Sequence, residues 1–199
     1  MSGVKIYIAG VGGQGSLTFS RLLGEAALDA GLGVVVSEVH GMSQRGGVVE
    51  SSVLIGDYES PLIGSGDADI VVAFEPAEAL RAVSKMSAKT LVLVNSRKTI
   101  PFTVTLGAAA YPDLESAFET LRTLCEGLYV IDAAGLAAKA GSAMAVNMVL
   151  MGALAALGRL PIGTEGMRAT LGEKQPARFR ETNDAAFELG RRAIAHAAS

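Results

Sequence analysis

The sequence predicts a single α/β domain over residues 1–199, Rossmann-like, with a mostly parallel sheet and helices towards its C-terminus. Residues 70–74 and 91–94 are continuous apolar runs, which are typical of strands covered by helices on both faces. Strand-like and helix-like segments alternate along the chain, and such βα repeats favour a parallel sheet that binds ligands at the carboxyl ends of its strands. The sequence shows no proline-rich linker, low-complexity tract or internal repeat, so one domain is expected.

The individual elements follow from the spacing of apolar residues. Alternating or β-branched segments predict strands at residues 4–9, 34–36, 49–55 and 128–131, in addition to the two buried runs. A helical stripe over residues 17–27 follows the first strand. Pro76 and Pro112 are placed to begin helices that extend to about residues 86 and 124. The remaining chain is expected to be helical at residues 144–157, 164–171 and 177–196.

Composition excludes several classes of function. The formal net charge is −3, and no basic stretch could follow a phosphate backbone, so nucleic acid is not an expected partner. The single cysteine, Cys125, excludes a disulfide framework and a self-contained iron–sulfur cluster, which needs about four thiolates. No histidine, cysteine and carboxylate group has metal-ligand spacing.

Two stretches of sequence bear on the cellular compartment of the protein. The N-terminal residues lack the pattern of a secretory signal. The uncharged stretch at residues 140–158 consists mainly of weakly lipophilic residues, so it is expected to be a buried helix rather than a membrane span. A cytoplasmic protein without a membrane partner is therefore predicted.

The turn after the first strand, GVGGQG at residues 10–15, is the first candidate site. Its spacing matches a dinucleotide-binding turn, in which free N–H groups at a helix N-terminus hold a phosphate or carboxylate. Glu38 ends the second strand, where such folds keep an acid for ribose, so an NAD-binding enzyme is one alternative. A further alternative is that the glycines only permit close strand–helix packing. The candidate residues here are Gly10, Gly12, Gly13, Gln14 and Gly15.

A polar loop after the second strand is the second candidate, on the same side of the sheet as the glycine turn. Its arginine could hold a carboxylate or phosphate through two hydrogen bonds. Asn95, at the end of a buried strand, is also placed for ligand contact. Asn147, within an apolar helix, is instead expected to fix a neighbouring turn or loop. The candidate residues of the loop are His40, Ser43, Gln44, Arg45, Gly46 and Gly47.

These residues do not assemble into a catalytic group. No nucleophile, base and orienting acid can be combined, so no catalytic residue is assigned. Glu75, Glu78 and Arg81 are expected to form an exposed helix start, where acids suit the positive helix end. Anion-holding loops without catalytic groups indicate a subunit of a larger enzyme. A stand-alone NAD-binding oxidoreductase and a non-catalytic partner-binding module remain the alternatives.

Seven motifs are spread along nearly the whole chain: GVGGQG (10–15), SEVHGMSQRGG (37–47), SPLI (60–63), AFEP (73–76), YP (111–112), AVNMV (145–149) and AFELG (186–190). Together they resemble the gamma-type domain of 2-oxoacid:ferredoxin oxidoreductases, most closely the small (beta) subunits of the indolepyruvate type. One position departs from the family pattern: Asp184 follows Asn183 where family members often have leucine. A charge is therefore expected at a position that is usually apolar.

The resemblance implies oxidative decarboxylation of an arylpyruvate to an acyl-CoA, with electrons passing to ferredoxin. In this family, thiamine diphosphate and the iron–sulfur clusters belong to the large (alpha) partner subunit, and coenzyme A is the co-substrate. By the same resemblance, residues 12–15 and 43–47 face the partner's active site and complete the substrate or coenzyme A pocket. The chain is then expected to bind no cofactor and to be inactive alone.

Overall fold

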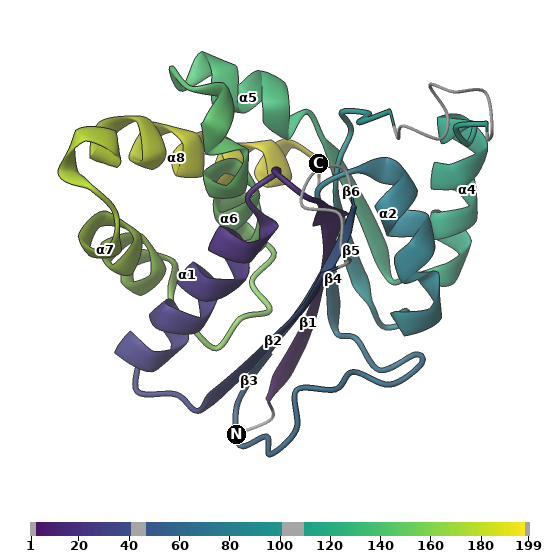
Figure 1. The fold of residues 1–199 in the computed structure, drawn as a ribbon, viewed down its shortest axis with the longest axis horizontal. Helices are drawn as coiled ribbons and strands as arrows, with labels where there is room; N and C mark the ends of the chain where they lie inside the picture. The colour runs from purple at the N-terminus through teal and green to yellow at the C-terminus, as the bar shows by residue number, and fades with distance from the viewer. Residues whose placement is uncertain (1–2, 41–46, 101–109, 198–199) are drawn as a thin grey trace.

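A computed structural model describes residues 3–40, 47–100 and 110–197. Six strands form one sheet in the order β2-β3-β1-β4-β5-β6, and helices cover both of its faces (Figure 1). The α/β class and the Rossmann-like arrangement are thus confirmed. The strands are β1 (Val4–Val11), β2 (Val34–His40), β3 (Val48–Ile55), β4 (Ile70–Ala73), β5 (Leu91–Asn95) and β6 (Gly127–Ile131).

The sheet is parallel from β1 through β4 and β5 to β6, whereas β3 runs antiparallel to both of its neighbours, β1 and β2. The strand β3 therefore separates β2 from β1, unlike in a simple βαβ unit. The physical reason is the short connection over residues 41–47, because a parallel crossover needs a dozen or more residues, whereas an antiparallel pair needs only a short loop.

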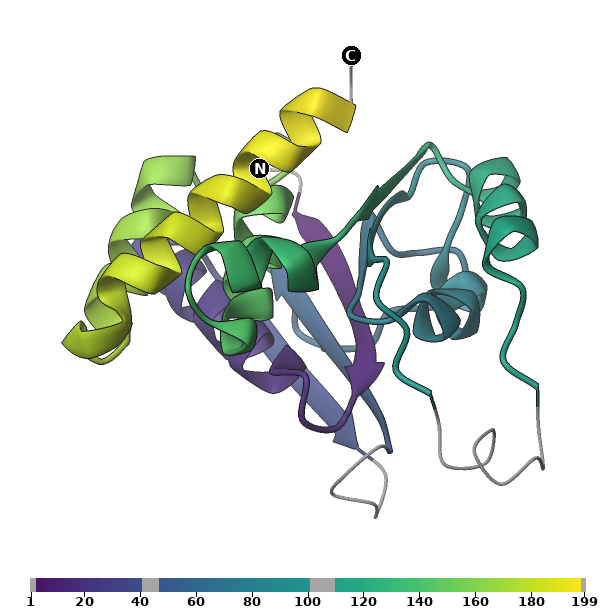
Figure 2. The same cartoon turned by 90° about the horizontal axis from the view of Figure 1, so that it is seen from above.

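Helices α1, α6, α7 and α8 lie on one face of the sheet, and α2 and α4 lie on the other (Figure 2). Alternate residues of β1 point into these two layers: Ile6 and Ile8 into the first core, Tyr7 and Ala9 into the second. The helices are α1 (Ser16–Asp29), α2 (Pro76–Arg81), α4 (Leu114–Leu124), α5 (Ala133–Lys139), α6 (Val146–Ala156), α7 (Thr164–Lys174) and α8 (Arg180–Ala197).

The predicted helices are mostly present, with tighter 3-10 turns at some ends. The helix expected at residues 76–86 is α2 followed by the 3-10 turn Ala82–Lys85, and 3-10 turns Ala143–Ala145 and Ala177–Phe179 precede α6 and α8. Helix α5 was not predicted. It begins where the Asp132 side chain accepts a hydrogen bond from Gly135 N at 2.8 Å, an N-cap followed by alanine-rich sequence.

The uncharged stretch at residues 140–158 contains the buried helix α6. Every residue from Met148 to Leu154 is buried, because α6 packs between the sheet and α8. Gly152 and Gly190 allow the backbones of α6 and α8 to touch: a Cβ at Gly152 would lie 2.7 Å from the carbonyl carbon of Phe187. None of the helices in the described ranges is both long and apolar enough to span a membrane.

Candidate functional site

The glycine turn joins β1 to α1 in a conformation that glycine favours. Gly13 and Gly15 have φ angles of 98° and 84°, in the left-handed region. The side chain of Gln14 closes the turn, since its Oε1 accepts a hydrogen bond from Val11 N at 2.9 Å. Gly15 is the N-cap residue of α1 and provides no side-chain cap, so no capping side chain accepts from the first N–H groups of this helix.

Two of these glycines also permit close packing. A Cβ at Gly10 would lie 3.1 Å from both Gln14 Oε1 and Phe74 Cβ. A Cβ at Gly15 would lie 3.5 Å from Asn147 Nδ2. The packing interpretation and the ligand interpretation are thus compatible: the glycines bring the turn close to its neighbours and leave backbone N–H groups beside the same space.

The strand-end asparagine is tied into the sheet edge. Asn95 is 4% exposed, and its Nδ2 donates to Phe74 O at 3.1 Å. Its Oδ1 accepts from Arg97 N at 3.4 Å and so directs the chain that follows β5. Two residues further on, Thr99 Oγ1 accepts from Gln14 Nε2 at 3.0 Å, which joins this segment to the glycine turn. Both polar atoms of the Asn95 side chain are thus bonded to the backbone, and its main role is to position the segment that follows β5.

A pocket of about 430 Å³ opens between the glycine turn, the segment after β5, helix α5 and the start of α6. Among the described residues that line it, Arg97 is the only charged one, and the pocket also faces the N-terminal ends of α1 and α6. Positive charge and helix N-termini favour an anionic ligand. The lining residues include Gly13, Gln14, Gly15, Asn95, Arg97, Thr99, Met144 and Asn147.

Arg97, Thr99 and Asn147 line the pocket, although the sequence did not assign them to the site. Arg97 and Thr99 follow a predicted strand end, and this position was the available signal for them. Asn147 was expected to have a structural role. Its Oδ1 accepts from Met148 N at 3.0 Å, while the half-buried amide lies beside Gly15 and lines the pocket. Because α6 lies far from the turn in sequence, only the fold could bring Asn147 to it.

The prediction that Glu75 and Glu78 are exposed is wrong. Their exposed fractions are 1% and 3%, because α2 packs its first turn against the sheet rather than presenting it to solvent. Glu78 Oε1 forms an ion pair with Arg81 Nε at 3.2 Å, whereas Glu78 Oε2 has no hydrogen-bond partner among the described residues. Burial raises the pKa of Glu78 above the usual value for a glutamate.

The loop after β2 falls mainly on residues outside the described ranges. Ser43, Gln44, Arg45 and Gly46 lie there, and for His40 the description covers only the backbone that ends β2. Gly47 is described, and its carbonyl accepts from Gly12 N at 2.8 Å. The end of this loop is therefore held directly against the glycine turn, on the side of the sheet that the sequence predicts.

The geometry does not favour a ribose-binding role for Glu38. Its strand, β2, is separated from β1 by β3, so the carboxylate is two strands away from the glycine turn. Its Oε1 accepts from Ser20 Oγ of α1 at 3.1 Å instead. In a dinucleotide-binding βαβ unit the second strand lies next to the first, which is what brings the acid to the ribose.

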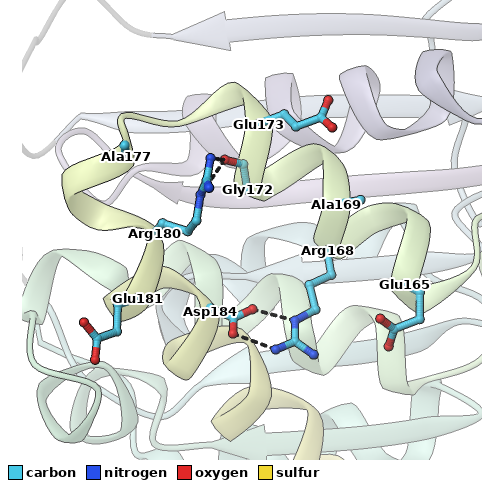
Figure 3. A pocket seen from close by; sticks show the side chains of 9 residues that line it. All are labelled: Glu165, Arg168, Ala169, Gly172, Glu173, Ala177, Arg180, Glu181 and Asp184. Atoms are coloured by element: carbon cyan, nitrogen blue, oxygen red, sulfur yellow. Dashed lines mark hydrogen bonds and ion pairs between the residues drawn. The ribbon is translucent and has the colours of Figure 1, made fainter.

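A second, larger groove lies between α7 and α8 (Figure 3). Both of its arginines are already bound within the chain. Arg168 donates from Nε and Nη2 to the two oxygens of Asp184 at 2.5 and 2.6 Å, and Arg180 donates to Gly172 O at 3.0 Å from Nη2. The guanidinium of Arg168 lowers the pKa of Asp184. The charge of Asp184, the residue that departs from the family pattern, is thus balanced by Arg168 of the neighbouring helix α7.

A metal centre needs a set of ligand side chains that lie close together. Within the described ranges, no three or more histidine, cysteine, aspartate or glutamate side chains come together in a way that could hold a metal ion. The one cysteine, Cys125, is half-buried at the end of α4, and burial raises the pKa of its thiol. A single thiol with this environment does not fit an iron–sulfur cluster, which needs about four thiolates.

Comparisons with known proteins agree with the motifs. The family model described as pyruvate ferredoxin/flavodoxin oxidoreductase matches residues 5–193. The indolepyruvate oxidoreductase subunit IorB of Archaeoglobus fulgidus is 43% identical over 187 residues, covering 94% of this chain and 93% of that protein. The gamma subunit of a keto/oxoacid ferredoxin oxidoreductase from Geobacter sulfurreducens has the same fold, with a TM-score of 0.72, 22% identity and coverage of 97% of this chain and 99% of that chain.

A longer protein contains the same fold as a part. The 2-oxoglutarate:ferredoxin oxidoreductase from Magnetococcus marinus, solved with 2-oxoglutarate, coenzyme A and succinyl-CoA bound, matches 98% of this chain and 32% of its own chain. The TM-score is 0.72 and the identity is 20%, so this likeness concerns the fold alone. The family match over nearly the whole chain and the IorB relative confirm the resemblance seen in the motifs: the chain belongs to the pyruvate ferredoxin/flavodoxin oxidoreductase family.

Proposed function

We propose that this chain is the small subunit of a cytoplasmic indolepyruvate:ferredoxin oxidoreductase and completes the substrate or coenzyme A pocket of a large subunit. The substrate class rests on the 43% identity to a relative named for indolepyruvate. The large subunit would carry thiamine diphosphate, which supplies the carbanion chemistry of decarboxylation, and the iron–sulfur clusters that pass electrons to ferredoxin. The single cysteine of this chain is consistent with that division.

The pocket beside the glycine turn is the observation that carries this proposal. Its one charged lining residue within the described ranges is the cation Arg97, and two helix N-termini face the same space. An arylpyruvate carboxylate and the phosphates of coenzyme A are both anions, and an arginine can bind either through charge-assisted hydrogen bonds. The role of this chain is then to bind and orient an anionic group, while the bond-breaking groups lie on the partner.

The surroundings of the pocket suit contact with another chain. Met144 lines the pocket and is 82% exposed, and Ile100, next to Thr99, is 51% exposed. Exposed apolar side chains beside a polar pocket are typical of a surface that another protein covers. We propose that residues 12–15 and the loop at residues 43–47 face the large subunit from this same side. Gly12 and Gly47 are held together by a backbone hydrogen bond, which supports a shared surface.

The test is reconstitution with the large subunit. The two chains are co-expressed, and reduction of a viologen dye is measured anaerobically with indolepyruvate and coenzyme A. Activity is expected only when both chains are present. A large subunit that is equally active alone contradicts the proposal, as does an isolated small chain that binds NADH by calorimetric titration.

Two arginine variants refine this test. Arg97→Ala and Arg45→Ala are each expected to raise the KM for indolepyruvate or coenzyme A, because each removes a cation proposed to meet the anionic ligand. Arg122→Ala is the matched control, since Arg122 is an exposed arginine on α4, away from the pocket. Equal kinetics in all three variants would show that the pocket does not receive the ligand.

A further inference from the structure

The buried carboxylate of Glu75 lies at the point where three segments meet behind the pocket wall. It is the N-cap residue of α2, and its Oε2 accepts from Ala77 N at 2.7 Å and Glu78 N at 3.2 Å. Aspartate, asparagine, serine and threonine are the usual N-cap residues. The longer glutamate side chain caps the helix with one oxygen and leaves the other free to reach further.

The second oxygen of Glu75 is used by residues that are distant in sequence. Oε1 accepts from Thr99 N at 3.3 Å and from the Tyr111 hydroxyl. All four partners of the two oxygens are therefore donors, an arrangement that suits a carboxylate, which only accepts hydrogen bonds. An amide in its place would direct an NH₂ group at N–H or O–H donors. Burial and the Glu75 carboxylate together raise the pKa of Tyr111, which keeps its hydroxyl a donor.

From Glu75 a chain of hydrogen bonds continues to the glycine turn. Thr99 donates its backbone N–H to Glu75, and its Oγ1 accepts from Gln14 Nε2 at 3.0 Å. Gln14 Oε1 in turn accepts from Val11 N at 2.9 Å. Arg97 is held between two anchored residues, because its own N–H donates to Asn95 and Thr99 is fixed two residues later. The position of Arg97 in the pocket thus depends on both anchors.

We infer that Glu75 is a positioning residue, which holds the Arg97–Thr99 segment against the glycine turn and so sets the place of the Arg97 cation in the pocket. This inference rests on the proposed function, because it assigns Glu75 a part in binding the same anionic ligand. Glu75 itself does not line the pocket, and its effect on the ligand passes through Thr99 and Arg97.

The test uses the complete complex with the large subunit and the variant Glu75→Asp. Aspartate keeps a carboxylate at a position where it caps helices well, but it is one methylene shorter and loses the reach to Thr99 and Tyr111. The complex is expected to assemble, and the KM that Arg97→Ala raises is expected to rise about tenfold, with kcat changed less. In the double variant the two effects are expected not to add, because Glu75 acts through Arg97.

A second readout does not depend on activity. Amide hydrogen exchange in residues 95–100 of the complex is expected to quicken in Glu75→Asp and, to a smaller extent, in Tyr111→Phe, which removes only the hydroxyl donor. Unchanged exchange in both variants overturns the inference, and so does an additive double variant. If Arg97→Ala leaves every KM unchanged while exchange quickens in Glu75→Asp, the positioning role stands and the proposed ligand pocket fails.

Discussion

The crossing of α6 and α8 offers a sharp test of the fold, because both helices place a glycine at the contact. In the structure, a Cβ built at Gly190 would lie 2.7 Å from the carbonyl carbon of Val149 and closer still to its oxygen. Non-bonded carbon atoms prefer about 3.5–4.0 Å, so the Gly190→Ala variant must move the helices apart by about 0.8 Å or more. The obstructing atoms are backbone, which cannot rotate away as a side chain can.

The magnitude follows from two opposing effects. Forced overpacking destabilises a core by about 1–3 kcal/mol, and a backbone collision belongs to the upper part of that range. Alanine is favoured over glycine within a helix by about 0.5–1 kcal/mol. The net loss in the free energy of unfolding is therefore about 2 kcal/mol, which for a chain of this size corresponds to a fall in Tm of about 4–8 °C.

The assay is denaturant and thermal unfolding of the purified chain, followed by circular dichroism. Gly166→Ala is the matched control: Gly166 lies in α7, is exposed, and has nothing within 4 Å of an added Cβ. This second variant should gain about 0.5–1 kcal/mol. A Gly190→Ala chain that is as stable as the original, with Gly166→Ala stabilised as expected, would refute the close backbone contact between the two helices.

Three further predictions concern the surface pair, the pocket and the turn. Asp184→Asn should lose less than about 1 kcal/mol at neutral pH, because both partners of the Arg168 ion pair are partly exposed and screened. Pairing with Arg168 lowers the pKa of Asp184 in the folded state. This contribution is therefore complete above the ordinary pKa of an aspartate and is lost as the pH falls through the lower folded pKa. The unfolding curves of both chains should then converge in acid. Asn147→Ala should raise a KM of the reconstituted enzyme but change the free energy of unfolding by less than about 1 kcal/mol. The reason is that, within the described residues, the Asn147 side chain accepts a hydrogen bond only from its neighbour Met148. Equal losses of stability and activity would contradict this prediction. Gly15→Ala should lose about 1–2 kcal/mol, because the φ of 84° places a Cβ in the left-handed region, and an unchanged midpoint of denaturation would argue against that conformation.

Much of the architecture could be predicted because local sequence carries it. Strands β4 and β5 are continuous apolar runs, and a strand buried on both faces needs such a run. The glycine turn was predictable because glycines in the sequence indicate a turn with positive φ angles, and Gly13 and Gly15 adopt such angles. Helix α5 was missed because alanine-rich segments show no clear apolar stripe, although Asp132 is a cap signal. The antiparallel β3 was missed although the short connection before it excludes a parallel crossover.

The sequence by itself determined the α/β class, the glycine turn, the family and the inability of one cysteine to hold a cluster, since each depends on residue type and short spacing. The tertiary structure alone decided which polar groups meet. From the sequence, Glu75 was predicted to lie at an exposed helix start. In the structure, Thr99 and Tyr111 donate hydrogen bonds to it from 24 and 36 residues away. Asn147 was predicted to have only a structural role, whereas in the structure α6 places it beside Gly15. The physical reason is that a carboxylate or amide has the same local pattern in both settings, and only long-range packing supplies its partners.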